Sequence, residues 1–580
     1  MDKSKITKSL AIFASVLLII IIGVASFAYF GTFNINLNNN VAVNINSSSP
    51  GDATFISNAT QLNLQVPAAN MSYTAANNTV AVKEDTAFLD VTLTGSANLL
   101  TTCTYDIVYE YDAGSNVYGQ GTTTKTSGAT KEITIEVNGM NGNNHFATET
   151  NFDHANIQSY YDSTNKYYKL VEGATIKSLG TEQSVRWKIT GRYYNLDVSQ
   201  AQLGGKNFTG KIYAISKGCS SEDGTTVKKG YETILANNGG AASMTTLTST
   251  DFATVTTVSD KGMYKAQDDL GTSYYFRGAV DNNWLKYGKY TKDMYNCNNG
   301  SISATDTGNS CTKIASSGDN IYWRIIRING DGSIRMIYSG VTSPSESTKV
   351  IKTSDTSIGN SRFSAKYNNA EYVGYMYTIG QQHGTGTDST IKTYLDNWYA
   401  NYTSLNATVT KITDQIYCND RTASTSDVAY SEANYTTLTS WSSTGTNYYY
   451  GAEGRVFHSP LSPNYKCPVV DDKFSTTTSK GNGKLSFPVG LITADELTFA
   501  GLPSGRLNDS FYLYTSDDYW AGSPYAFIYS STSFGFHVFY DGTLDYSGVY
   551  DNYGIRPVVS LSSESKLLGS GTYNDVYTVN

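Results

Sequence analysis

The first half of the chain alternates apolar and polar residues in many short runs, which Gly, Asn, Ser or Asp separate from one another. Alternation of this kind places every second side chain on one face of a strand, so each run predicts a half-buried β-strand. Several such strands joined by polar turns indicate a β-sandwich, which we assign to residues 31–217. The runs begin at Phe33, Val41, Leu62, Phe88, Thr104, Glu132, Val185 and Gly210.

A polar segment rich in Gly, Ser and Thr follows at residues 218–270 and predicts a linker. Within it, apolar residues at helical spacing predict one short helix at residues 226–237. Residues 243–259 are mostly polar, and we expect them to be flexible or lightly structured.

Residues 271–580 are predicted to contain β-hairpins with tight turns. Asn329-Gly-Asp-Gly332 lies between two apolar runs and predicts a β-hairpin, and Asp541-Gly542 predicts a second one. A last strand is expected at Ile555–Leu561. The pattern therefore favours a separate C-terminal region, which we call the head.

Two helices are expected in the head. Apolar residues recur on one face of residues 388–405, which predicts a helix with a buried stripe. Thr493-Ala-Asp-Glu496 is a capping box that opens a second helix, and Gly501 ends it. We therefore predict a mainly β protein with an α+β head.

The N-terminus predicts export. Lysines within residues 1–8, a cytoplasmic basic tail, precede a run of about twenty uncharged apolar residues at 10–30, which can cross a bilayer. Positive charge stays on the cytoplasmic side. We predict a transmembrane helix or signal anchor at residues 9–30 of a single-pass protein in the bacterial plasma membrane, with an extracellular C-terminus. Cleavage near Ala28, which would release a secreted protein, stays open.

Composition narrows the partners. A net charge of −8 gives no electrostatic footprint for nucleic acid. The 47 tyrosines favour sheets and contact surfaces, because Tyr gives a large contact area at low entropic cost. Tyrosines near the C-terminus are therefore candidate contacts for a protein or glycan ligand. They are Tyr512, Tyr514, Tyr519, Tyr525, Tyr529, Tyr540, Tyr546, Tyr550 and Tyr553.

The even number of cysteines is compatible with disulfides in an exported protein, although six cysteines can pair in many ways. Free thiols are the alternative. No Cys-x-x-Cys motif or His cluster indicates a zinc site. The candidate pairs, in order of support, are Cys297 with Cys311, Cys418 with Cys467, and Cys103 with Cys219.

No catalytic motif stands in the sequence. The five histidines are isolated, and no phosphate loop, nucleophile elbow or zinc-peptidase motif occurs. Asp331 lacks the further acidic ligands of a calcium loop. The adjacent acids Asp471-Asp472 and Asp517-Asp518 have no defined partner for acid–base chemistry. We therefore predict no enzyme activity, no metal and no cofactor.

Two C-terminal motifs resemble a known family. Trp520-Ala-Gly-Ser523-Pro524 and Tyr553-Gly-Ile-Arg556-Pro557-Val-Val-Ser-Leu561 are similar to the end of a C-type-lectin-like domain. The variant in question is shared by formylglycine-generating-enzyme-like proteins and the variable proteins of diversity-generating retroelements. The segments at 416–421, 466–468 and 487–496 resemble bacterial surface proteins with this domain. The resemblance covers residues 271–580 and implies a C-type-lectin-like fold.

The same resemblance bears on function. The enzymatic branch of this family has a late cysteine pair that binds copper, and no cysteine follows Cys467 here. The calcium motifs of sugar-binding lectins are also missing. We assign structural roles, in the loop and the last strand, to Trp520, Ser523, Pro524, Arg556 and Pro557.

A shorter resemblance concerns the N-terminal part. Ala25–Phe30, followed by an Asn-rich start of the predicted sandwich, is similar to camelysin-type and biofilm-fibre proteins, which implies a spacer or assembly role.

Together these observations predict a cell-surface-anchored binding or adhesion protein whose head presents a ligand face rich in Tyr, Ser and Asp. If the head is like the retroelement variable proteins, part of that face could be diversified at the DNA level. An extracellular matrix or fibre-forming protein is the alternative, and an enzyme of the formylglycine-generating type is a third, less supported one.

Overall fold

A computed structural model gives the fold, and within it the protein is mainly β, with 45% of residues in strands and 14% in helices. The predicted membrane segment at 9–30 lies outside the described residues, as do the predicted strands that begin at Phe33 and Val41, and Tyr529. Within the described ranges, no helix combines the length and apolar character that a membrane span requires. The structure describes residues 54–65, 81–95, 99–111, 132–139, 142–194, 207–223, 228–297, 300–305, 310–424, 441–443, 448–528 and 532–580.

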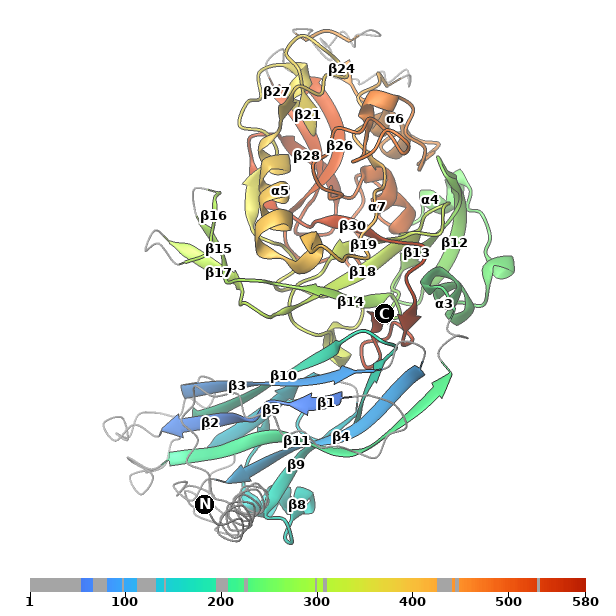
Figure 1. Cartoon of the computed structure of the whole chain (residues 1–580). Helices are drawn as coiled ribbons and strands as arrows, with labels where there is room; N and C mark the ends of the chain where they lie inside the picture. Colours follow the sequence, from blue (N-terminus) through green and yellow to red (C-terminus); the bar gives the residue numbers. More distant parts are fainter. Residues whose placement is uncertain are drawn as a thin grey trace, which may run out of the picture. The chain divides into compact units, whose positions relative to one another are not determined.

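Two antiparallel sheets form the first region (Figure 1). One has the order β1-β3-β10-β5-β7, and the other has the order β2-β11-β4-β9-β6 with β8 beside β9. The bounds are β1 Thr54–Ser57, β2 Thr60–Gln65, β3 Ala81–Thr94, β4 Leu99–Tyr111, β5 Ile133–Asn138, β6 Asn143–Asn144, β7 Thr150–Asn151, α2 His154–Ile157, η1 Gln158–Tyr160, β8 Tyr161–Asp162, β9 Tyr167–Ser178, β10 Gln183–Tyr194 and β11 Asn207–Asp223.

Alternate residues of these strands meet in one apolar core, which confirms the sandwich-like arrangement predicted from the sequence. Trp187 of β10 is fully buried there, and its indole nitrogen donates a hydrogen bond to the Tyr105 hydroxyl at 3.1 Å. The region continues to Asp223, past the predicted boundary at 217, because β11 stays paired with β4 as far as Leu99.

The predicted linker contains regular structure. The helix α3 (Gly230–Asn237) confirms the short helix, and the 3₁₀ turn η4 (Ala241–Ser243) follows it. β12 (Lys261–Asp268) then pairs with β13 (Gly271–Gly278), so the head's sheet begins before residue 271.

The expectation of a lightly structured segment at 243–259 needs correction. It holds the short helix α4 (Ser249–Phe252), whose first turn is closed by a capping box. The Asp251 carboxylate accepts hydrogen bonds from the Thr248 backbone N–H and hydroxyl, both at 2.7 Å. A polar sequence can therefore be ordered by local side-chain capping.

The larger sheet of the head has the order β12-β13-β18-β14-β32-β31, and β19 joins β18 to β30. The predicted hairpin at Asn329-Gly-Asp-Gly332 connects β18 to β19 and is confirmed. The C-terminal strand β32 lies parallel to β14. The remaining bounds are β14 Trp284–Lys289, β18 Asn320–Ile328, β19 Ile334–Tyr338, β30 Val558–Leu561, β31 Leu567–Leu568 and β32 Tyr577–Val579.

A second sheet of the head has the order β20-β29-β26-β27-β28, with β24 beside β26. The hairpin predicted at Asp541-Gly542 connects β27 to β28, and Gly542 has a φ of +86°, which glycine adopts without strain. The bounds are β20 Asn360–Arg362, β24 Tyr448–Tyr449, β26 Tyr519–Ile528, β27 Thr532–Val538, β28 Leu544–Gly548 and β29 Asn552–Gly554.

Three helices pack on this part of the head (Figure 1): α6 and α7 contact β26, and α5 contacts β20. Both predicted helices are present: α5 spans Thr390–Tyr402, and α7 spans Ala494–Ala500 between the Thr493 cap and Gly501. α6 spans Gly451–Val456. The shorter elements are β15 Met294–Cys297, β16 Ile302–Ser303, β17 Cys311–Ala315, η5 Glu346–Thr348, η6 Ala370–Val373, β21 Met376–Tyr377, β22 Thr387–Asp388, η7 Ser404–Asn406, β23 Tyr417–Cys418, η8 Val470–Asp472 and β25 Lys473–Phe474.

All six cysteines form disulfides. Cys103 is joined to Cys219 between β4 and β11, Cys297 to Cys311 between β15 and β17, and Cys418 to Cys467. The two better-supported pairings are confirmed, and so is the weaker third one.

Candidate functional site

The structure divides the predicted tyrosine face into buried and exposed rings. Tyr512, Tyr519 and Tyr525 are each at most 2% exposed, so they belong to the core and cannot form part of a contact surface in this fold. Tyr519 and Tyr525 lie on β26, all of whose residues are buried. Both faces of that strand are covered, which the count of tyrosines alone did not indicate.

Tyr540 is the most exposed of the predicted rings that the structure describes, at 56%. It sits at the β27–β28 turn, where its carbonyl oxygen accepts a hydrogen bond from the Tyr514 hydroxyl at 3.2 Å. Its ring centroid lies 4.4 Å from that of Phe539. We call Tyr514, Phe539, Tyr540 and Tyr553 the aromatic edge.

The buried side chain of His537 packs against the aromatic edge. The Tyr553 ring stacks on His537 with centroids 4.6 Å apart and an interplanar angle of 3°. The His537 ring also packs edge to face with the Trp520 ring, with centroids 6.2 Å apart. Burial lowers the pKa of His537 to about 4, so this imidazole is neutral at physiological pH. His537 is therefore a packing residue, and it fixes the Tyr553 ring.

Carboxylates surround the aromatic edge. The Asp518 carboxylate accepts a hydrogen bond from the Tyr540 backbone N–H at 2.8 Å. Burial raises the pKa of Asp518, and the charges of Asp517 and Asp541 raise it further. The pKa of Tyr514 is also raised, first by burial and then by nearby acids including Asp541 and Asp517. The aromatic edge thus lies in a negative local potential.

A second pair of exposed rings lies apart from the aromatic edge. Tyr550 is 41% exposed, and its ring centroid is 4.8 Å from that of Tyr367. Tyr367 was missed by the sequence analysis, because it stands in a polar loop without periodicity. Tyr546 is only partly exposed, since its ring stacks on buried Tyr525 with centroids 3.9 Å apart.

The structure gives the residues that were assigned structural roles the following surroundings. Trp520 is fully buried and donates its indole N–H to the Ser361 carbonyl at 2.9 Å. The Ser523 hydroxyl accepts a hydrogen bond from the Ala494 N–H at the start of α7, at 2.9 Å. Pro524 lies within β26.

Hydrogen bonds from Arg556 and to Pro557 also hold the start of the last predicted strand, Ile555–Leu561. Buried Arg556 donates to the carbonyl oxygens of Tyr338 and Leu513, at 3.2 and 3.0 Å. The carbonyl oxygen of Pro557 accepts a hydrogen bond from the Tyr338 N–H at 2.8 Å. Arg556 therefore pairs with backbone carbonyl groups that adjoin the last strand.

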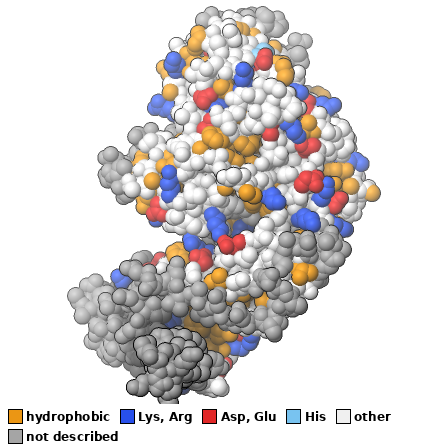
Figure 2. Space-filling model, viewed as in Figure 1, with side chains coloured by type: hydrophobic (Ala, Val, Ile, Leu, Met, Phe, Trp, Pro, Cys, Tyr) orange, Lys and Arg blue, Asp and Glu red, His pale blue; other side chains and the backbone are white. Residues whose placement is uncertain are grey.

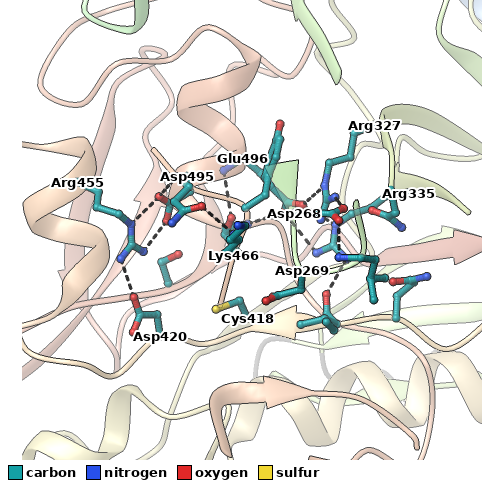
Figure 3. Close-up of a pocket in the computed structure, with 18 residues that line it drawn as sticks. Asp268, Asp269, Arg327, Arg335, Cys418, Asp420, Arg455, Lys466, Asp495 and Glu496 are labelled. Atoms are coloured by element: carbon teal, nitrogen blue, oxygen red, sulfur yellow. Dashed lines mark hydrogen bonds and ion pairs between the residues drawn. The ribbon is translucent and has the colours of Figure 1, made fainter. Parts of the chain in front are cut away.

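A polar pocket in the head holds a dense set of charges (Figure 3). Glu496 of α7 lies between two arginines of the β18–β19 hairpin: its Oε1 is 3.1 Å from Arg327 Nε and 2.6 Å from Arg335 Nε. Arg327 also pairs with Asp268, at 2.8 Å. All four side chains are buried. Although burial alone would raise the pKa of Glu496, the two guanidinium groups hold it below its usual value.

Arg455 of α6 forms the other part of this polar pocket. It donates two hydrogen bonds to the Asp495 carboxylate, both at 2.9 Å, and one to Asp420 at 2.7 Å. The cavity between the side chains has a volume of about 30 Å³, which is enough for one or two water molecules and not for an organic ligand. We interpret the polar pocket as an ion-pair network that joins α6 and α7 to the sheet.

The sequence contained an indirect signal for this network. Arginines stood within the apolar runs on either side of the predicted hairpin, and a buried arginine needs an anionic or carbonyl partner. The Thr493–Glu496 capping box was recognised, but its carboxylate could not be paired with Arg327 or Arg335 from local pattern alone.

The histidines do not assemble into a site. His383 pairs with buried Asp472 at 2.9 Å, and His458 pairs with buried Glu453. In the part of the chain that the structure describes, no group of three or more His, Cys, Asp or Glu side chains is arranged to hold a metal ion.

Comparison with known proteins adds no relative: no family model, curated protein or solved structure matches the chain. The fold and the surface define the protein as a disulfide-bonded, mainly β protein whose head exposes an aromatic edge rimmed by carboxylates.

Proposed function

We propose that this protein is a cell-surface-anchored binding or adhesion protein and that the aromatic edge of the head is its ligand face. The observation that carries the proposal is the exposed Tyr540 ring, held at a hairpin turn by Tyr514 and backed by the stacked Tyr553–His537 pair. Rigid tyrosines supply contact area at low entropic cost, as they do in the binding loops of recognition proteins. A C-type-lectin-like head would be a suitable scaffold for such a face.

Two features support a place outside the cytoplasm. The three disulfides suit an oxidising compartment. The basic residues before the apolar run at 10–30 suit a membrane anchor that exports the remainder of the chain.

The carboxylates beside the aromatic edge select a class of partner. A Lys or Arg side chain placed over Tyr540 would gain a cation–π contact and the attraction of Asp518 and Asp541. We therefore propose a partner protein with exposed basic residues. An acidic partner would be repelled.

The test uses residues 44–580, which form one compact unit. A binding screen against bacterial and host surface proteins and glycans is run with this protein and with Tyr514→Ser/Tyr540→Ser. The matched control is Tyr367→Ser/Tyr550→Ser, which removes the other exposed pair of tyrosines. We expect the screen to find a ligand whose affinity falls at least tenfold in Tyr514→Ser/Tyr540→Ser and is unchanged in Tyr367→Ser/Tyr550→Ser. Both variants should keep the melting curve of the wild type.

Loss of binding in the control alone would move the ligand face to the second pair of rings and refute the aromatic edge. Hits that neither variant affects would place the site elsewhere on the molecule.

One observation favours the fibre-forming alternative. Among the strands that the structure describes in the first region, β1 and β7 lie at the edges of one sheet, and β2 and β6 at the edges of the other. Unpaired sheet edges can add strands from another chain. Concentration-dependent polymers of residues 44–580 in light scattering, together with an empty binding screen, would favour this function.

A further inference from the structure

A groove of about 330 Å³ lies in the head between the segment before β12 and the loop that precedes Cys467. This volume falls within the range of small-molecule sites and is about tenfold that of the polar pocket. The groove does not include any residue of the aromatic edge. Its lining includes Leu247, Phe252, Lys265, Gln267, Lys466 and Phe499.

The floor of the groove is rigid. Phe252 at the end of α4 and Phe499 near the end of α7 meet edge to face, with centroids 5.0 Å apart. Arg277 holds both helix ends, donating to the Thr498 and Phe499 carbonyls at 2.9 and 3.1 Å and to the Asp251 carbonyl at 2.9 Å. The two rings are thus fixed before any ligand arrives, which lowers the entropic cost of binding.

The rim of the groove carries positive charge. Lys265 and Lys466 both line it, and neither ammonium group has an ion-pair partner among the residues that the structure describes. Lys466 also lines the polar pocket, whose acids are already engaged (Figure 3). Asp269 accepts a hydrogen bond from the Cys467 N–H and pairs with Lys473 at 2.9 Å. Asp495 accepts one from the Asn464 N–H and pairs with Arg455 at 2.9 Å. Two ammonium groups without counter-charges at one groove complement an anionic ligand.

The remaining lining indicates which anion fits. Phe252 and Phe499 are more than nine-tenths buried, so the floor offers a small apolar area but no deep pocket for a bulky apolar anchor of a peptide. The walls instead include three polar residues, Thr246, Gln267 and Asn464. The Gln267 amide also donates to the Thr272 hydroxyl at 3.0 Å, and the Asn464 side-chain oxygen accepts a hydrogen bond from the Lys466 N–H at 3.0 Å. Such groups match a ligand rich in hydroxyl groups.

We propose that this groove binds an acidic polysaccharide, with its carboxylate or phosphate groups between Lys265 and Lys466 and a sugar face against the exposed part of the phenylalanine floor. This site lies beyond the proposed function, because it uses other residues and a ligand of the opposite charge from the basic partner of the aromatic edge.

The experiment measures binding of polygalacturonate to residues 44–580 by calorimetry, with neutral dextran and poly-L-glutamate as comparison probes. The test variant is Lys265→Gln/Lys466→Gln. The control is Lys188→Gln/Lys484→Gln, which removes the same charge from two exposed lysines outside the groove. We expect polygalacturonate to bind, the test variant to weaken it at least tenfold, and the control to change it less than twofold.

Other outcomes overturn the proposal. Equal weakening by both variants would show nonspecific attraction by net charge. Binding of poly-L-glutamate as tight as that of polygalacturonate would assign the groove to acidic peptides, and no binding of either probe would remove the anion site. Because Tyr514→Ser/Tyr540→Ser leaves the groove intact, polygalacturonate binding should persist in that variant, so the two proposals fail independently.

Discussion

The first region and the head are both built mainly from antiparallel strands, yet they place their charged residues differently. The sandwich core is formed by aliphatic and aromatic side chains, and its arginines pair near the surface, as Arg192 does with Glu84 and Glu136. The head encloses Arg324, Arg335, Arg421 and Arg556, all essentially inaccessible to solvent. Among its described residues the sandwich buries the acids Asp106, Glu132 and Asp153 but no arginine. In the head, by contrast, buried arginines donate to carbonyl groups of the irregular segments.

Arg324 illustrates this use of charge. It donates to the carbonyl oxygens of Lys349, Val350 and Val280, at 3.0, 2.9 and 2.7 Å, and its guanidinium lies 4.2 Å from the centre of the Trp284 ring. Burial lowers the pKa of Arg324 to about 9. The arginine fixes three loop carbonyls at once, which no apolar side chain could do. We infer that the head depends on specific polar contacts more than the sandwich does.

The largest expected effect is that of Glu496→Gln. This change leaves Arg327 and Arg335 buried with one anion fewer, and breaking a buried pair costs about 3–5 kcal/mol of the free energy of unfolding. The matched change in the sandwich is Glu84→Gln, whose carboxylate is half-exposed beside Arg192; a pair of that kind is worth about 0–1 kcal/mol. Urea denaturation with peptide-resolved hydrogen exchange measures both effects.

The Glu496 result also has a pH dependence. Since the pKa of Glu496 is lower in the folded protein than in the unfolded chain, its stabilisation is present above the unfolded pKa and is lost as the pH falls through the folded value. The difference between wild type and Glu496→Gln should therefore shrink on acidification. Equal costs for Glu496→Gln and Glu84→Gln at neutral pH would contradict the contrast drawn between the two regions.

The second effect concerns the disulfides. Cys103 and Cys219 are 116 residues apart, and Cys297 and Cys311 are 14 apart. In the chain-entropy model a disulfide typically contributes about 2–4 kcal/mol, and more for a longer loop. We expect Cys103→Ser/Cys219→Ser to destabilise the sandwich more than Cys297→Ser/Cys311→Ser destabilises the head. Hydrogen exchange of β4 and β17 reports each region, and the reverse order would show that native-state packing outweighs loop length.

The same contrast explains what the sequence could predict. The alternation at Thr104–Tyr111 is enough to place β4, because Tyr105, Ile107, Tyr109 and Tyr111 on one face all join the apolar core. Asp106 and Val108 on the other face are buried as well, outside that core. The Thr493 cap and Gly501 likewise locate α7. β26 has no such pattern, since both of its faces are covered, and Tyr519 and Tyr525 were therefore assigned to the surface.

The functional residues show the same limit. Tyr540 could be predicted because it adjoins the Asp541-Gly542 turn, where side chains are exposed. The lysine-rimmed groove could not, because Lys265 and Lys466 are brought together by tertiary packing across some two hundred residues of sequence. The Glu496 network has the same origin, with partners as far apart as Asp268 and Glu496. Local pattern predicts elements, and long-range polar pairing decides which side chains meet.

The smallest expected effect is that of Asp518→Asn, which tests the negative electrostatic potential around the aromatic edge. The pKa of Asp518 is raised in the folded protein, so the folded state holds its proton more tightly than the unfolded chain does. Stability from this group is present below the unfolded pKa and is lost as the pH rises through the folded value. Asp518→Asn keeps an acceptor for the Tyr540 N–H and removes the charge, so it should raise the melting temperature slightly at pH 7 and not at pH 3.

The control for this change is Asp545→Asn, on the neighbouring strand β28, where the carboxylate accepts a hydrogen bond from the Tyr546 backbone N–H at 2.8 Å. Asp518→Asn could both stabilise the head and weaken binding of the ligand found in the screen. This result would mean that the Asp518 carboxylate lowers stability but attracts a basic partner. If Asp518→Asn stabilises the head and leaves binding unchanged, the negative charge of Asp518 does not contribute to recognition. The tyrosine rings alone would then bind the ligand.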